Sequence, residues 1–101
     1  RVVLDDDRVT GPVVLSEFGG VRVENGEAGW GYAQVDGADA LLVRYRALLA
    51  AVNRSALAGF CYTQLTDTFQ EQNGLLTMDR RPKADLAALA RATRGEEEPS
   101  D

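Results

Sequence analysis

The sequence predicts an α/β fold in which two parallel strands are joined by a helix. Residues 13–15 form a continuous apolar run without alternation, which is typical of a strand buried on both faces. From Asp36 to Asn53 the apolar residues recur at three- and four-residue steps, which is typical of a helix. Residues 58–65 are again rich in aromatic and β-prone types. Strand, helix and strand in this order form the βα unit of a parallel sheet.

Length and charge restrict the possible functions. A chain of 101 residues forms at most one domain, and no apolar run approaches the length that crosses a bilayer. The net charge of -5 repels phosphate backbones and anionic lipid heads, so we expect neither nucleic acid nor a membrane as a partner. The first residue is Arg1 and no apolar secretory signal follows it, so we expect the chain to be cut from a longer protein.

Cysteine and histidine usage limits the chemistry. Cys61 is the single cysteine, which excludes an internal disulfide and a cysteine metal cage, and histidine is absent. Three consecutive aspartates, residues 5–7, lack the alternate spacing of a calcium loop and are interpreted as a solvated surface loop. We therefore expect no metal and no cofactor, so catalysis must rest on carboxylates. A lone cysteine is compatible with a cytoplasmic location, with a secreted parent as the alternative.

The first strand leads into a carboxylate and a glycine pair. Pro12 can begin this strand, where its missing N–H donor does least harm. Glu17 lies where the strand emerges from the core, and Gly19 and Gly20 allow a sharp turn close to a ligand. The α/β folds place their chemistry at this edge of the sheet. From residue type alone, Glu17 is either a capping or solvated carboxylate or a catalytic one.

The stretch between Gly20 and the helix contains a turn signal and aromatic residues. Residues 21–24 alternate and are expected to form a short strand or part of a long loop. Trp30 follows among glycines. It either provides an aromatic platform for a sugar or a base, or plugs the mouth of the core.

The helix is expected over residues 36–53. Asp36 or Asp39 is its expected N-cap, and residues 53–55 contain the stop signal. Five residues at helical spacing form its apolar face: Leu41, Tyr45, Leu48, Leu49 and Val52.

Polar side chains follow the second strand, at the same edge of the sheet as Glu17. Amide side chains suit a site that recognises hydroxyl groups, but surface loops are polar in general, and both interpretations stay open. The polar residues are Thr63, Gln64, Thr66 and Asp67, followed by Gln70, Glu71, Gln72 and Asn73.

The C-terminal part is expected to contain a second helix and a tail. Residues 74–78 are expected to be briefly extended, and Pro82 is expected at the first position of the last helix. The acidic tail, residues 95–101, is expected to be disordered, which leaves residues 1–94 as the ordered part. The apolar stripe of the last helix contains Leu86, Leu89 and Ala90.

Four stretches carry a resemblance to a known family. They are residues 12–20, residues 60–67 (Phe-Cys-Tyr-Thr-Gln-Leu-Thr-Asp), residues 70–75 (Gln-Glu-Gln-Asn-Gly-Leu) and residues 79–83 (Asp-Arg-Arg-Pro-Lys). In this order they resemble glycoside hydrolase family 2, which includes β-galactosidases, β-glucuronidases and β-mannosidases. The resemblance is to the last quarter of the catalytic (β/α)8 TIM barrel. It implies that residues 1–94 are a C-terminal fragment of that barrel, with strands 7 and 8 and their helices.

The resemblance also implies a role for Glu17. In that family the Glu of the Ser-Glu-Phe-Gly motif, here residues 16–19, is the catalytic nucleophile of a retaining exo-glycosidase. Such an enzyme hydrolyses β-glycosidic bonds by double displacement, and the implied partner is a β-glycoside of the kind that a β-galactosidase cleaves. The expected substrate-binding residues are Trp30, Tyr62, Gln64 and Asp67.

Two departures from the family's pattern bear on this role. A retaining glycosidase needs a second carboxyl group about 5 to 5.5 Å from the first. The family's acid/base is a Glu preceded by Asn at the end of the fourth strand, and no Asn-Glu pair occurs here. Many members carry a Trp near the end of the eighth strand, where this chain has Tyr62, Thr63 and Gln64. We therefore expect a chain that carries the nucleophile but not the acid/base, and that is inactive alone.

A quarter of a barrel leaves strand edges and apolar helix surface uncovered. We therefore expect the isolated fragment to self-associate, through edge pairing or exchange of elements between copies. The alternative to an enzyme fragment is a non-catalytic carbohydrate-binding or self-assembling module derived from such a barrel.

Overall fold

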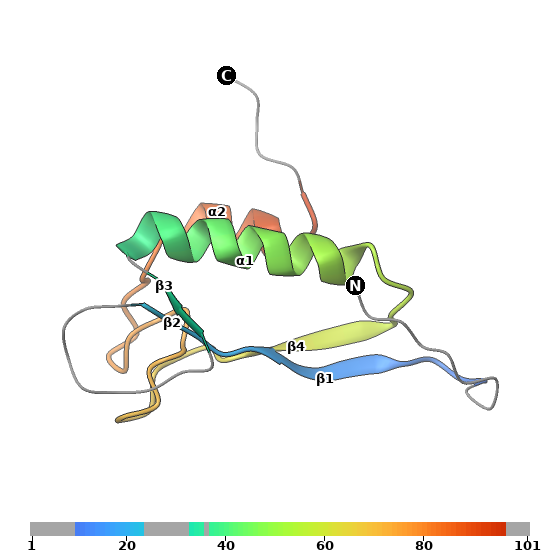
Figure 1. Cartoon of the computed structure of the whole chain (residues 1–101), viewed down its shortest axis with the longest axis horizontal. Coiled ribbons are helices and arrows are strands. Elements are labelled where there is room, and N and C mark those ends of the chain that lie inside the picture. The colour runs from blue at the N-terminus through green and yellow to red at the C-terminus, as the bar shows by residue number, and fades with distance from the viewer. Residues whose placement is uncertain (1–9, 24–32, 36, 97–101) are drawn as a thin grey trace, which may run out of the picture.

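The protein is an α/β chain built on two parallel strands with two helices against one of their faces (Figure 1). The structure, a computed structural model, describes residues 10–23, 33–35 and 37–96. In chain order the elements are β1 (Val14–Gly19), β2 (Val21–Val23), β3 (Ala33–Val35), α1 (Gly37–Asn53), β4 (Gly59–Thr63) and α2 (Leu86–Thr93). The predicted order of strand, helix and parallel strand is confirmed by β1, α1 and β4.

The pairing of β1 with β4 contains an irregularity at the carboxylate. Leu15 lies opposite Phe60, and Phe18 lies opposite Tyr62. Two residues of β1, Ser16 and Glu17, therefore face the single residue Cys61 of β4, which is the arrangement of a β-bulge. The strand continues to Gly19 and does not end at residue 15, so Glu17 lies within the strand and not in the loop after it.

One face of the strand pair is covered by α1 and α2. Phe60 and Tyr62 alternate on β4 and, with Phe18 of β1, pack against the helices. The core cluster that they contact contains Tyr45, Leu49, Leu89 and Ala92. Because these four come from both helices, the strands and the helices are joined by a single core.

The other face of the strand pair is open among the described residues. Val14 is 56% exposed, and Cys61 in the middle of β4 is exposed as well. The prediction of a first strand buried on both faces is therefore wrong for this chain. The physical reason is that the described residues supply helices for one face only, and no third strand pairs with the outer edges of β1 and β4 within them.

The helix α1 forms where the apolar spacing predicts it. Leu41, Tyr45, Leu49 and Val52 are buried, while Leu48 is only partly covered. Asp39 lies inside the first turn, so it is not the N-cap, and Asp36 lies outside the described residues. The helix ends at Asn53, and the hydroxyl of Ser55 donates to the carbonyl of Ala51 over 2.9 Å, which satisfies one of the last carbonyls.

The chain forms a second small sheet after β1 and before α1. Its first strand is β2, so of the two alternatives for residues 21–24, a short strand or part of a long loop, the short strand forms over residues 21–23. β2 pairs in parallel with β3, which the sequence pattern did not predict. The reason is that β3 has only three residues, too few to display a period of two.

The last helix begins later than the sequence predicts. Asp85 is the N-cap of α2, and its carboxylate accepts a hydrogen bond of 3.2 Å from the N–H of Ala88. Pro82 is therefore not the first helical residue. It forms an isolated bridge with Leu76, and the N–H of Lys83 donates to the carbonyl of Leu75 over 3.0 Å, so residues 82 and 83 pair with residues 75 and 76 before the helix begins.

Two residues that we predicted to belong to a disordered tail are hydrogen-bonded to the last turn of α2. The N–H of Gly95 donates to Ala92 and the N–H of Glu96 donates to Arg91, over 3.1 and 2.9 Å. These are the two hydrogen bonds of a Schellman motif, and Gly95 has the positive φ of 74° that the motif requires. Residues 95 and 96 therefore cap the helix, and residues 97–101 lie outside the described residues.

No helix among the described residues has the length and apolar character needed to span a membrane.

Candidate functional site

The site forms where β1 leaves the strand pair. At the bulge the side chains of Ser16 and Glu17 are both exposed. The backbone of β1 stays attached to β4 beyond the bulge, because the N–H of Gly20 donates to the carbonyl of Thr63 over 2.7 Å. A small hollow of about 120 Å³ lies at this point, lined by Glu17, Phe18, Gly19, Gly20 and Thr63. The structure thus brings Glu17 and Thr63 together, at the carboxyl ends of two parallel strands.

The glycine pair is required by the backbone at this turn. Gly19 and Gly20 have positive φ angles of 105° and 72°, which other residues adopt only at a cost. A Cβ atom on Gly19 would also lie 2.5 Å from the ring of Tyr62. The positive φ angles show why glycine is needed at both positions, and the close neighbour of Gly19 is the Tyr62 ring. The predicted close approach of this backbone to a ligand stays a prediction.

Tyr62, near the end of β4, packs its ring into the core between the strands and the helices. Its ring makes edge contacts with Phe18 and Tyr45, with ring centroids 5.3 and 4.8 Å apart. Burial raises the pKa of the Tyr62 hydroxyl to about 12. The ring faces the helices and is not among the residues that line the hollow beside Glu17. The expected contact between Tyr62 and a sugar stays a prediction, and the role that the geometry gives it is packing.

Gln64 and Asp67 hold the loop between β4 and α2. The side-chain amide of Gln64 donates to the carbonyl of Glu71 over 3.3 Å. The carboxylate of Asp67 accepts 2.6 Å from the ammonium of Lys83 and 2.9 Å from the N–H of Gly74. Both side chains, predicted to bind substrate, therefore make contacts within the loop. Trp30 lies outside the described residues.

Two residues of this loop have structural roles that the sequence analysis did not assign. Lys83 forms a largely buried ion pair with Asp67, in which the side chains are 12% and 14% exposed, and it also donates to the carbonyl of Gln72 over 3.1 Å. Asn73 is fully buried, and within the part of the chain that the structure describes its side-chain amide has no hydrogen-bond partner. A lysine 16 positions from its carboxylate gives no local spacing signal, and Asn73 resembles any polar loop residue.

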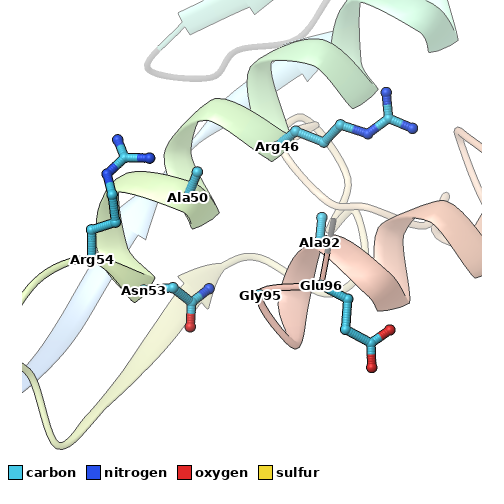
Figure 2. A pocket seen from close by; sticks show the side chains of 7 residues that line it. All are labelled: Arg46, Ala50, Asn53, Arg54, Ala92, Gly95 and Glu96. Carbon is cyan, nitrogen blue, oxygen red and sulfur yellow. The ribbon is translucent and has the colours of Figure 1, made fainter. Parts of the chain in front are cut away.

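A second hollow lies between the two helices, away from Glu17. It has a volume of about 480 Å³, and Ala50 and Ala92 lie on either side of it (Figure 2). The helices run antiparallel to the strands, so this C-terminal end of α1 and α2 is opposite the strand ends that carry Glu17 (Figure 1). Its lining residues are Arg46, Ala50, Asn53, Arg54, Ala92, Gly95 and Glu96.

The polar groups at this second hollow are largely engaged with neighbours. The side-chain amide of Asn53 donates to the carbonyl of Leu49 over 2.9 Å. Glu96 pairs with Arg94 over 2.8 Å, and this pairing lowers the pKa of the Glu96 carboxyl. Figure 2 shows Arg54 directed away from α2. The polar groups do not converge on one point, so this hollow is not a candidate for catalysis.

The chemistry available at the strand ends is that of a carboxylate. Within the described ranges, no three side chains of the metal-binding types gather into a group that could hold an ion. An exposed carboxylate on a rigid strand can attack an electrophilic carbon or accept a proton. Comparison of the chain with protein families finds no match, and comparison with curated proteins finds none.

Proposed function

We propose that this chain is the C-terminal quarter of the TIM-barrel catalytic domain of a retaining exo-glycosidase of glycoside hydrolase family 2. Residues 1–94 then contain barrel strands 7 and 8, which correspond to β1 and β4, with α1 and α2 as their helices. In support, β1 and β4 are adjacent and parallel, and both helices cover the face that lies outside in a barrel. The open face then lies toward the barrel interior.

One observation carries the proposed chemistry. Glu17 is exposed at a bulge near the carboxyl end of β1, which is where barrel enzymes place their catalytic groups. Glu17 is the nucleophile in this proposal. Its carboxylate attacks the anomeric carbon of a β-glycoside, the bond to the leaving oxygen breaks, and a covalent glycosyl ester forms on the enzyme. Water then hydrolyses the ester, and the sugar is released with retained configuration.

The second carboxyl group is proposed to come from a part of the barrel outside this chain. No Asn-Glu pair occurs in these 101 residues, so the acid that protonates the leaving group belongs to another strand. The substrate is a β-glycoside of the type that β-galactosidases cleave. No cofactor, metal or nucleic acid takes part. The lone cysteine, Cys61, is compatible with a cytoplasmic parent protein, and a secreted parent is the alternative.

A trapping experiment tests the nucleophile. The longest natural form of the protein is incubated with 2-deoxy-2-fluoro β-glycosides, whose glycosyl enzymes hydrolyse slowly, and its peptides are mapped by mass spectrometry. The proposal predicts a sugar adduct on Glu17. An adduct on another carboxylate of an active protein would contradict the assignment. The matched control is Glu71→Gln, because Glu71 follows β4 in the neighbouring loop, and this variant is expected to form the Glu17 adduct normally.

A second candidate function is a self-assembling or carbohydrate-binding module without catalysis. It is favoured by the open face of the strand pair, where Val14 and Cys61 are exposed. Isolated copies of this 101-residue chain are then expected to associate through this face or through the strand edges. Sedimentation of the purified chain distinguishes the cases, because a stable monomer with cooperative unfolding would contradict self-association.

A further inference from the structure

We infer that Phe69 is a substrate-binding residue that contacts the leaving-group side of the glycoside, an inference that rests on the proposed function. Phe69 lies at the tip of a tight turn in the loop between β4 and α2. Phe69 is 76% exposed, the highest value among the exposed large hydrophobic residues that the structure describes. Single exposed apolar residues are common, so exposure alone does not support a site. The conformation of the turn supplies the further argument.

The backbone of Phe69 is in the left-handed region, with a φ of 52°. For a bulky residue this conformation is strained, and glycine, asparagine or aspartate normally occupy such turn positions. The turn is held by reciprocal backbone hydrogen bonds of 2.9 Å between Thr68 and Glu71. A phenylalanine in this position has neither a conformational nor a solvation advantage, and a contact of its ring with a ligand would account for its presence.

The turn is attached rigidly to the end of the strand pair. Thr63 lines the hollow beside Glu17, and Gln64 is the next residue in the chain. The side-chain amide of Gln64 donates to the carbonyl of Glu71, which belongs to the turn. Asp67, the residue before the turn, forms the largely buried ion pair with Lys83, which connects the first part of this loop to its end. The loop between β4 and α2 lies at the same end of the strands as β2 and β3 (Figure 1). The turn that carries Phe69 therefore belongs to the loop that leaves the sheet beside Thr63, at the end of the strands that carries Glu17.

The expected occupant follows from the exposure of the ring. The sugar that is attacked must lie close to Glu17, in the interior of the site, whereas the leaving group must point toward solvent in order to depart. A ring that is largely exposed at the rim suits the leaving group, either a second pyranose or an aryl group. An aromatic ring can stack on either of these through its apolar face.

The test uses the longest natural form of the enzyme and two turn variants. Phe69→Asn removes the ring but suits the left-handed backbone, and Phe69→Tyr keeps a ring. The inference predicts that Phe69→Asn lowers kcat/KM for aryl β-glycosides and disaccharides by roughly threefold to tenfold. The value for a glycosyl fluoride, whose leaving group is a single atom, is expected to stay unchanged, as are all values for Phe69→Tyr.

A matched control separates the ring from the backbone. Arg80 lies in the same loop with a positive φ of 71°, so Arg80→Asn relieves the same kind of strain without removing an aromatic ring. Both Asn variants are expected to unfold at or above the temperature of the natural protein. Equal kcat/KM values for Phe69→Asn and Arg80→Asn on aryl glycosides would overturn the inference. So would a change in oligomeric state on Phe69→Asn, because the ring would then contact another protein surface.

The same set of variants keeps the two proposals distinguishable. Hydrolysis that persists in Glu17→Gln would overturn the proposed function. Hydrolysis that is lost in Glu17→Gln but unaffected by Phe69→Asn would overturn only the inference on Phe69. If the protein hydrolyses no glycoside, ligand-observed NMR with a phenyl β-glycoside decides, because absence of binding that depends on Phe69 overturns this inference as well.

Discussion

Glu17 and Asp67 are both carboxylates near the carboxyl ends of the parallel strands, but the protein holds them in different ways. The Asp67 carboxylate accepts hydrogen bonds from Lys83 and Gly74, and its side chain is only 14% exposed. Glu17 is exposed at a bulge, and within the described residues no group donates a hydrogen bond to its carboxylate. The backbone alone positions Glu17, through the bulge and the glycine turn. A carboxylate that is already hydrogen-bonded stabilises the fold, and one that is positioned without being bonded is available to a substrate.

The largest effect on stability is expected from breaking the ion pair of Asp67. Asp67→Ala leaves the Lys83 ammonium buried without its counter-charge, and loss of one partner of a buried pair costs about 3 to 5 kcal/mol. Urea unfolding of the natural protein and the variant measures this cost. The double variant Asp67→Ala with Lys83→Met is expected to recover part of it, because no charge is then buried. A loss below about 1 kcal/mol in the single variant would contradict a structural role for this pair.

Glu17 is expected to behave in the opposite way. Because its side chain is exposed, Glu17→Gln is expected to change the free energy of unfolding by no more than about 0.5 kcal/mol. The same urea experiment provides the comparison with Asp67. A large destabilisation by Glu17→Gln would indicate that Glu17 is part of the scaffold, and the contrast between the two carboxylates would be lost.

The free energy of unfolding is expected to depend on pH through Tyr62, whose ring lies against Gly19. Burial raises the pKa of Tyr62 to about 12, against an ordinary value of 10.0. The folded state therefore binds the phenolic proton more tightly than the unfolded state. Stability is unaffected below pH 10 and falls as the pH rises from about 10 to about 12, by about 3 kcal/mol in total.

Urea unfolding between pH 8 and pH 11.5, about the range over which the phenol begins to titrate, measures this decline. Tyr62→Phe removes the titrating group and keeps the ring, so its stability is expected to decline less over the same range. Tyr45 contributes in the same direction, because burial raises its pKa as well. An equally steep decline in Tyr62→Phe would contradict the assignment to Tyr62.

A smaller effect than those of Asp67 and Tyr62 is expected at the start of α2. Asp85→Ala removes the carboxylate that accepts from the N–H of Ala88, which costs about 1 kcal/mol. Asp85→Asn retains an acceptor and is expected to cost less than half of that. Pro82→Ala is the informative control. Since Pro82 is not in the helix, its replacement is not expected to shift the start of α2, which amide hydrogen exchange of residues 86–89 would detect.

The contrast between the two carboxylates also explains what the sequence could and could not predict. The helix α1 and the strands β1 and β4 were predictable because their patterns are local and each is repeated over several residues. The bulge at Glu17 was not, because it depends on the register between strands that are far apart in sequence. The pairing of Asp67 with Lys83 was missed for the same reason. The sequence analysis predicted that α2 starts at Pro82, whereas its N-cap is Asp85. The backbone hydrogen bond from the N–H of Lys83 to the carbonyl of Leu75, which keeps this stretch out of the helix, has no sequence signal.

The site was predictable in part. The motif around Glu17 and the glycine pair identified the strand end that forms the hollow with Thr63. Residue type alone did not separate Glu17 from Asp67, or a packed Tyr62 from a ring that meets a ligand. Phe69 gave no signal in the sequence, because its strained backbone and exposed ring are evident only once the turn between Thr68 and Glu71 is formed.

The most direct test of the central claim, that Glu17 is a nucleophile, is the configuration of the product formed by a variant without it. Glu17→Gly in the longest natural form of the protein is supplied with sodium azide and an aryl β-glycoside. Azide then occupies the space of the missing carboxylate and displaces the phenolate directly, so the predicted product is the α-glycosyl azide. Formation of the β-glycosyl azide, or hydrolysis at the rate of the natural protein, would contradict the role assigned to Glu17.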